Sequence, residues 1–125
     1  MATDPELLDH ACDLFAAVGR ISTGRMFSGT ALYVEGDVMF AAILGGTVWM
    51  KSDASTQPAY LAAGSRPFSF MRQTGLREAP GLMSLPEEAM DDADTAVAWA
   101  RLSLVSARVA AEGRRRAKAR KAARA

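Results

Sequence analysis

Apolar residues near the amino terminus recur with the spacing of one face of a helix. Asp4 and Pro5 stand where such a helix would begin, because an Asp side chain accepts hydrogen bonds from first-turn amides and Pro is tolerated at the first helical position. Gly19 suits the end of this helix. The apolar face of the predicted amphipathic helix consists of Leu7, Leu8, Ala11, Leu14, Phe15 and Val18.

Residues 21–51 show no helical period and contain short runs rich in Val, Phe, Tyr, Trp and Met. Gly36-Asp37 and Gly45-Gly46 separate these runs, as turns separate the strands of successive hairpins. Such short connections force neighbouring strands to pair antiparallel, because a parallel crossover needs about a dozen residues or more. The predicted strands lie near residues 22–27, 30–35, 38–44 and 47–51.

The next segment predicts a short helix followed by two further strands. The helix runs from Ser55, as its capping residue, to Ala63, and Gly64 follows its end. Pro67 to Met71 alternates as a strand does, and residues 82–85 form a second candidate strand. Between them, residues 73–81 are polar and contain Gly and Pro, which predicts a loop.

A long helical region is predicted to start at Pro86-Glu87-Glu88. Asp91, Asp92 and Asp94 crowd its first turns, where negative charge favours the positive end of the helix dipole. Its expected buried stripe consists of Ala98, Leu102, Val105 and Val109, widened by Val97 and Leu104. Helices at both ends of a run of strands make this an α+β chain.

The charge is segregated along the 125 residues. Residues 1–107 contain 7 Lys and Arg against 13 Asp and Glu, a net charge of −6. Residues 108–125 contain 8 basic residues against Glu112 alone, a net charge of +7. We therefore expect a folded α+β domain over residues 1–107 and a basic extension over residues 108–125 that is helical or frayed.

The basic extension is the strongest sign of a partner in the composition. Its cations are spaced by Ala, without aromatic residues, which suits phosphate groups rather than base edges. Contact with nucleic acid, contact with an acidic partner and a solubilising role all remain open, whereas the lack of an aliphatic face speaks against a membrane surface. The expected contact residues are Arg114, Arg115, Arg116, Lys118, Arg120, Lys121 and Arg124.

Candidate chemistry is sparse, and we expect no catalytic residue, cofactor or metal. A phosphate-loop match in residues 19–26 fails, since Arg25 and Met26 replace the Lys and the hydroxyl residue. His10 is the one histidine, and we expect it on a solvated helix face. Cys12 is the one cysteine and a possible redox thiol. A lone cysteine, an acidic start and no long apolar run together favour the cytoplasm.

Five segments carry a family resemblance: "RMFSGTALYVEGDVMFA", "VWMKSD", "AAGSRPFSF", "LPEEAMDD" and a later Trp. Together they resemble the TfoX N-terminal domain family of the Sxy/TfoX competence regulators, over roughly residues 20–108. The matching positions are Arg25, Met26, Phe27, Gly29, Leu32, Tyr33, Gly36, Phe40, Ala41, Lys51, Asp53, Gly64, Pro67, Phe68, Pro86, Glu87, Glu88, Asp92 and Trp99. Ser28, Ala31, Trp49, Leu82 and Met83 depart from the family pattern.

The resemblance implies a stand-alone, two-layer α+β domain, with an antiparallel meander of about five or six strands flanked by amino- and carboxy-terminal helices. It implies no catalytic residues and a regulatory role exerted through proteins that act on DNA. We therefore expect a non-enzymatic adaptor whose body binds a regulatory protein partner and whose extension can touch nucleic acid. The alternatives are a stand-alone DNA-binding protein and a small-ligand module or enzyme, and a homodimer is possible in each case.

Overall fold

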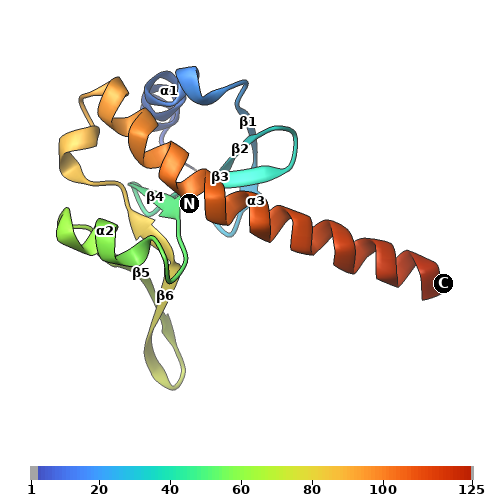
Figure 1. Cartoon of the computed structure of the whole chain (residues 1–125). Coiled ribbons are helices and arrows are strands. Elements are labelled where there is room, and N and C mark those ends of the chain that lie inside the picture. Colours follow the sequence, from blue (N-terminus) through green and yellow to red (C-terminus); the bar gives the residue numbers. More distant parts are fainter. Residues whose placement is uncertain (1–2, 125) are drawn as a thin grey trace.

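The computed structural model describes residues 3–124, in which six strands and their flanking helices follow one another along the chain. In chain order the elements are α1 (Pro5–Leu14), the 3-10 turn η1 (Ala16–Val18), β1 (Ser22–Met26), β2 (Gly29–Val34), β3 (Val38–Leu44), β4 (Thr47–Lys51), α2 (Gln57–Ala62), β5 (Pro67–Arg72), β6 (Gly75–Ser84), the 3-10 turn η2 (Glu87–Ala89) and α3 (Ala93–Arg124). Figure 1 shows this arrangement, with α3 leaving the body of the domain toward the carboxy terminus.

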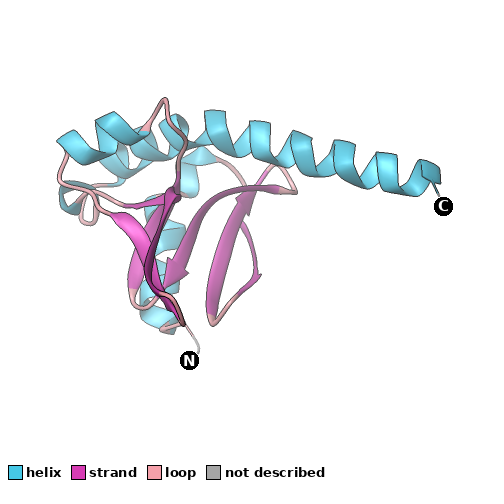
Figure 2. Cartoon of the chain, turned by 90° about the horizontal axis from the view of Figure 1, so that it is seen from below, coloured by secondary structure: helices cyan, strands magenta, loops and turns pink. Residues whose placement is uncertain are grey.

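The strands form one antiparallel sheet in the order β1-β2-β3-β4-β6-β5, which confirms the predicted α+β class. Each of the first four strands pairs with its neighbour in sequence through a short turn, as the glycine spacing predicts. At the far side β6 pairs with β4, so that β5 becomes the edge strand. Figure 2 shows α3 running along one side of the strands and continuing beyond them.

The prediction of a loop over the polar residues 73–81 is wrong, because β6 begins at Gly75. Arg72 pairs with Gly75 across a two-residue turn, and Gly75 adopts a φ of 118° that side chains disfavour. Beyond the turn the register continues, with Phe70 opposite Arg77 and Ser69 opposite Glu78. Backbone pairing holds this exposed hairpin together, so its sequence lacks the apolar alternation that marks a half-buried strand.

Two predicted helix boundaries shift in the structure. The first helix is capped as expected, with Asp4 Oδ1 accepting from Glu6 N at 3.0 Å, but it ends at Leu14 and continues only as the 3-10 turn. Ser55 is not the cap of the second helix. Asp53 Oδ1 accepts from the amides of Ser55 and Thr56, and this local turn delays the start of α2 to Gln57.

The start of α3 also lies later than predicted. After Pro86 the chain makes only the 3-10 turn η2, and α3 begins at Ala93. Asp92 is the residue that caps the helix, because its Oδ1 accepts from Asp94 N at 3.0 Å and from Thr95 N at 3.3 Å. Within residues 3–124, none of the helices is both long enough and apolar enough to cross a membrane.

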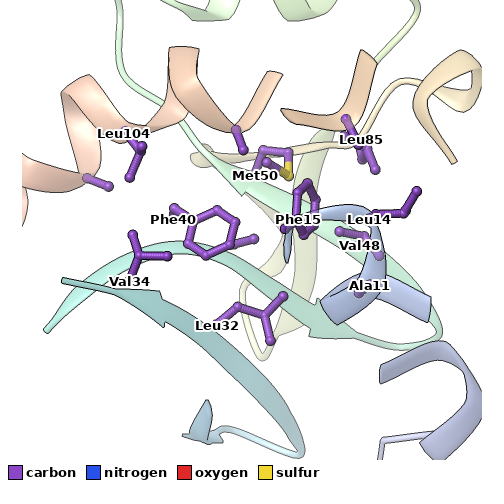
Figure 3. Packing of buried hydrophobic residues seen from close by; sticks show 14 of the residues in the cluster. Ala11, Leu14, Phe15, Leu32, Val34, Phe40, Val48, Met50, Leu85 and Leu104 are labelled. Carbon is purple, nitrogen blue, oxygen red and sulfur yellow. The ribbon is translucent and has the colours of Figure 1, made fainter. Parts of the chain in front are cut away.

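The main core lies between the sheet and the helices α1, α2 and α3. A register shift opposite Leu32 and Tyr33 forms a bulge in β3, so that Phe40 and Ala41 both belong to this core although they are adjacent in sequence. Phe15, which directly follows α1, meets Phe40 edge-on, with ring centroids 5.2 Å apart. Figure 3 shows the two rings at the centre of the packed side chains.

The buried face of α3 differs from the prediction. Val105 and Val109 are 58% and 68% exposed, and Ala98 is exposed as well, whereas Val97 and Leu104 are buried as expected. The face that packs on the core consists mostly of small residues: Ala96, Ala100, Ser103, Ala107 and Ala111. Bulky side chains of the sheet fill the space beneath α3, so small side chains bring the helix backbone close to them.

One polar cluster fixes the position of α2 against α3. The hydroxyl of Tyr60 lies 2.5 Å from Ser103 Oγ and donates to the carbonyl of Trp99 at 3.2 Å. Burial raises the pKa of Tyr60 to about 12, with the Ser103 hydrogen bond acting against that shift. The phenol therefore stays neutral and can serve as a donor to α3 over the whole physiological range.

The close contact between α3 and the sheet predicts a position-dependent effect of added volume. Ala107→Leu places a branched side chain on the fully buried face and should lower the free energy of unfolding by about 1–3 kcal/mol through overpacking. Ala98→Leu makes the same change on the exposed face and should stay within about 0.5 kcal/mol. Urea unfolding of both variants measures the difference. Equal losses would contradict the assigned helix face.

Candidate functional site

The sheet face away from the main core carries a second, smaller apolar cluster. Its buried members are Ala42, Leu44, Trp49 and Leu82, and Met26, Met39 and Phe68 pack against them. A groove of about 930 Å³ lies over this cluster, lined by residues of the β1–β2 turn, the middle strands and the β5–β6 hairpin. Within residues 3–124 this groove is larger than a second hollow beside the β1–β2 turn, and its lining contains no residue of α1, α2 or α3.

Trp49 forms the floor of the groove and is held there by three contacts. Its Nε1 donates to the carbonyl of Leu44 at 3.1 Å, and Phe68 meets its ring edge-on with centroids 5.1 Å apart. The guanidinium of Arg66 lies over the same ring, 5.3 Å from the centroid. Trp49 is therefore only 6% exposed. Side chains of the hairpin cover the tryptophan in place of a third layer.

Phe27 stands at the rim of the groove in a strained conformation. Met26 pairs with Gly29, so Phe27 and Ser28 are the two residues of a tight hairpin turn. Phe27 has a φ of 50°, a left-handed value at a turn position that glycine normally occupies. Its side chain is nevertheless 76% exposed. Contacts of this side chain within the protein therefore offset little of the strain, which costs about 1–2 kcal/mol.

The ionisable residues that line the groove are all cations. Lys51, Arg66 and Arg72 line it, and they are three of the 7 Lys and Arg in residues 1–107, whereas none of the 13 Asp and Glu of that segment does so. Arg72 lies over Phe70, 5.3 Å from the ring centroid. Burial and, less strongly, Arg114 lower the pKa of Lys51. The groove thus combines an apolar floor with positive charge on an acidic domain.

The first turns of the basic extension are fastened to the β2–β3 turn. Arg108 donates to both carboxylate oxygens of Glu35, with Nη2 2.5 Å from Oε2, and Arg115 Nε lies 2.7 Å from Asp37 Oδ2. Arg114 donates to the carbonyl of Asp37 at 3.1 Å. The hydrogen bonds from Arg108 and Arg115 lower the pKa of the Glu35 and Asp37 carboxyls, respectively. The extension is therefore a continuous part of α3 that the turn holds at its base.

Beyond Ala111 the helix buries no residue. Of the expected contact residues, Arg115 pairs with Asp37 and Arg116 with Glu112, one helical turn earlier. The ion pairs found within residues 3–124 do not involve the others, which are Arg114, Lys118, Arg120, Lys121 and Arg124. The thirteen residues after Ala111 span about 20 Å at the rise of an α-helix, so their charges extend well away from the sheet.

The family-motif positions divide between the groove and the scaffold. Met26, Phe27, Lys51 and Phe68 line the groove. Arg25 is exposed and lines a smaller hollow beside the same turn. The other motif positions serve the fold. Tyr33 lies against Gly24, Gly36 turns the chain at a φ of 86°, and Asp53 caps a turn. Phe40 and Trp99 belong to the main core, Pro67 begins β5, and Pro86 precedes η2.

Gly29 has a steric reason to be glycine. A Cβ at this position would lie 2.0 Å from the carbonyl oxygen of Ile43 on the neighbouring strand. Any side chain would therefore push β2 away from β3 directly beside the Phe27 turn. The motif glycine thus holds the turn that presents Phe27.

Sequence reasoning missed three residues that shape the groove, namely Arg66, Phe70 and Arg72. Their signal is the alternation along β5, where an Arg or Phe stands at every second position from residue 66 to residue 72. Alternate residues of a strand share a face. Only the contacts of Arg66 and Phe68 with Trp49 show which face lines the groove.

His10 and Cys12, the two residues of α1 with potentially reactive side chains, lie outside the groove. His10 Nε2 is 2.5 Å from the carbonyl of Met90, so this exposed ring links α1 to the segment before α3. Cys12 is half-buried, and burial, followed by Asp9 and Asp13, raises the pKa of its thiol. Among residues 3–124 no three His, Cys, Asp or Glu side chains gather as metal ligands would.

Comparison with known protein families gives one match. The family described as TfoX N-terminal domain matches residues 13–107, which include β1 to β6 and the first half of α3. No curated protein shows a significant sequence match to the chain.

The ion pairs at the β2–β3 turn predict that the base of the extension loosens in acid. A carboxyl with a lowered folded pKa contributes stability that is complete above its unfolded pKa and is lost as the pH falls through the folded value. The ordinary values are 4.5 for Glu35 and 3.8 for Asp37, so the loosening should begin below about pH 4.5. Cα chemical shifts of residues 108–118 measure it.

The double variant Glu35→Gln and Asp37→Asn removes both acids and should show the loosened shifts already at pH 7. Added salt should weaken the same contacts in the unaltered chain, because the paired side chains are about half exposed. Shifts that are identical in both proteins at pH 7 would mean that the ion pairs do not order the helix.

Proposed function

The chain belongs to the TfoX N-terminal domain family, and we propose that it is a non-enzymatic regulatory adaptor that binds a protein partner through the groove. Membership supports a regulatory role in general. The specific form proposed here is control of transcription or another DNA transaction in the cytoplasm, exerted through the partner rather than by chemistry on a substrate.

The observation that carries this proposal is the turn at Phe27. An exposed aromatic ring in a left-handed conformation costs stability in the free protein. Burying such a ring against a partner would contribute roughly 1.5–3 kcal/mol and would offset that cost. The ring stands at the edge of a groove whose floor is already apolar. Aromatic anchors beside apolar pockets are where binding energy concentrates in protein interfaces.

The composition of the groove supports recognition over catalysis. Its polar side chains are two arginines, one lysine, two serines and one threonine, and no His, Cys, Asp or Glu lines it. A hydroxyl nucleophile would need a base within hydrogen-bond reach, and the lining offers only Lys51 in that role. Lys51 is half-buried next to apolar side chains, which suits a contact with a partner equally well.

A second candidate function is nucleic-acid contact by the extension. Arg114, Lys118 and Lys121 follow at intervals of four and three residues, which places them on one face of α3. The contacts of Arg108 and Arg115 hold the base of this helix to the body. A positioned row of cations is suited to the phosphate backbone. In this arrangement the extension would add affinity for nucleic acid to an adaptor bound elsewhere to its protein partner.

Replacing the strained aromatic tests the adaptor function. Phe27→Gly should leave the free energy of unfolding unchanged or raise it by up to about 1 kcal/mol, because glycine relieves the left-handed strain. Capture of the partner from the native cell should fall at least about tenfold. Val109→Ala truncates an apolar residue on α3 that is 68% exposed, and it should leave capture unchanged. Undiminished capture by the Phe27 variant would refute the groove as the binding surface.

Deleting residues 114–125 separates the two candidate functions. The truncated chain should keep its protein partner and lose its affinity for DNA. In the full chain, neutralising about four to six phosphates would make the logarithm of the binding constant fall with the logarithm of salt concentration at a slope of about −4 to −5. Titrations at several salt concentrations measure that slope. DNA affinity that survives the deletion would place the nucleic-acid contact on the domain body.

A further inference from the structure

We propose that the groove recognises an acidic segment of the partner, in which carboxylates accompany aliphatic or aromatic side chains. This inference rests on the adaptor function and adds the chemistry of the partner to it. The surface concerned comprises the Phe27 turn, the floor around Trp49, and the cations Lys51, Arg66 and Arg72.

The charge distribution is the first reason. Residues 1–107 carry a net charge of −6, yet none of their Asp and Glu residues line the groove, whereas three of their seven cations do. The ion pairs found within residues 3–124 involve only Arg108, Arg115 and Arg116 among the cations, so the groove cations have no carboxylate partner there. A positive site on a negative body attracts an acidic ligand and repels a basic one.

The two arginines are held in a way that suits carboxylates. The guanidinium of Arg66 lies over Trp49, and that of Arg72 over Phe70, each 5.3 Å from the ring centroid. A guanidinium that lies over a ring keeps the donors at its edge available for a planar, bidentate partner. Stacking also restricts these side chains before binding, so less entropy is lost when the carboxylate arrives.

The floor adds a demand for apolar side chains. Met26, Met39, Leu44 and Leu82 supply aliphatic and thioether surface between the two walls. Methionine adapts its shape to different apolar partners. Phe27 and Met71 line the groove from different hairpins, and their exposed fractions of 76% and 74% leave both free to contact an inserted side chain. The ligand must therefore present apolar groups as well as negative charge.

The aromatic rings argue for a peptide rather than a nucleic acid in this groove. Bases bind to proteins by stacking on free aromatic faces. Here Arg66 lies over Trp49, which is 6% exposed, and Arg72 lies over Phe70. Phe68 meets Trp49 edge-on and stacks on Phe70 with ring centroids 6.1 Å apart. Three of the four rings that line the groove thus pack against one another and against guanidinium groups, and the single exposed ring of Phe27 is no platform for successive bases.

The test uses the full chain and three synthetic probes. The first is a short peptide in which Asp and Glu alternate with Leu and Phe, the second replaces each acid by Lys, and the third is oligothymidylate. Backbone amide shifts of the labelled protein locate binding, and calorimetry measures affinity. The acidic peptide should shift residues of β4, β5 and the Phe27 turn. The basic peptide should leave those residues unshifted, and oligothymidylate should affect only the extension.

Matched charge variants isolate the groove. Arg66→Gln with Arg72→Gln should weaken the acidic peptide at least about tenfold, whereas Arg20→Gln with Arg101→Gln removes the same charge from exposed sites outside the groove and should change affinity less than about twofold. Should the groove variant fail to fold, Ser28→Glu and Ser28→Lys change the rim at an exposed turn position, and they should weaken and strengthen binding respectively.

The outcomes distinguish this inference from the adaptor function. An acidic peptide that does not bind, or binds equally to both double arginine variants, overturns the acidic chemistry while Phe27-dependent capture of a partner still stands. Oligothymidylate shifting the groove residues in place of the peptide overturns it in favour of nucleic acid. Loss of Phe27 dependence in partner capture overturns the adaptor function itself, whichever probe binds.

Discussion

The close approach of α3 to the sheet is the constraint on which the rest of the structure depends. Its inner face carries Ala100, Ser103 and Ala107, all fully buried, and the space below is filled by large side chains such as Phe40 and Phe15. The bulge in β3 turns Phe40 and Ala41 toward the same side, so the large ring of Phe40 lies in the core and the facing residues of α3 are mostly small. Volume is thus divided unequally between the two layers.

This packing places α1, α2 and α3 on one face of the sheet. On the other face, Phe68 and Arg66, at the start of the β5–β6 hairpin, cover Trp49. Such cover is incomplete, because a two-stranded ribbon cannot enclose a sheet face as a helical layer does. The groove is what remains uncovered. Its aromatic and cationic lining is therefore a consequence of how the hairpin shields the tryptophan.

The same helix connects the groove-bearing body to the basic extension. Arg108 and Arg115 bond to Glu35 and Asp37 in the β2–β3 turn, so the base of the extension is fixed to the sheet that forms the groove. Acidic residues of the body and basic residues of the extension form ion pairs at this turn. Beyond it the charges of α3 have no such partners on the body among residues 3–124 and point into solvent. In the proposed function, one rigid element thereby sets the distance between a protein-binding surface and a phosphate-binding one.

The sequence by itself determined most local elements and the antiparallel pairing of β1 to β4. Glycine-bearing turns and period-two alternation located β1 to β4 to within about a residue at each end. Asp4 caps α1 and Gly36 turns the chain, as predicted. Tertiary structure decided what local patterns cannot encode. Val105 and Val109 follow helical spacing yet face solvent, because α3 packs on the sheet through a different face that consists mostly of small residues. The polar segment from Gly75 became a strand through pairing. Arg66, Phe70 and Arg72 became a groove wall only when that pairing placed them beside Trp49, since a surface shared by distant segments exists only after the chain has folded.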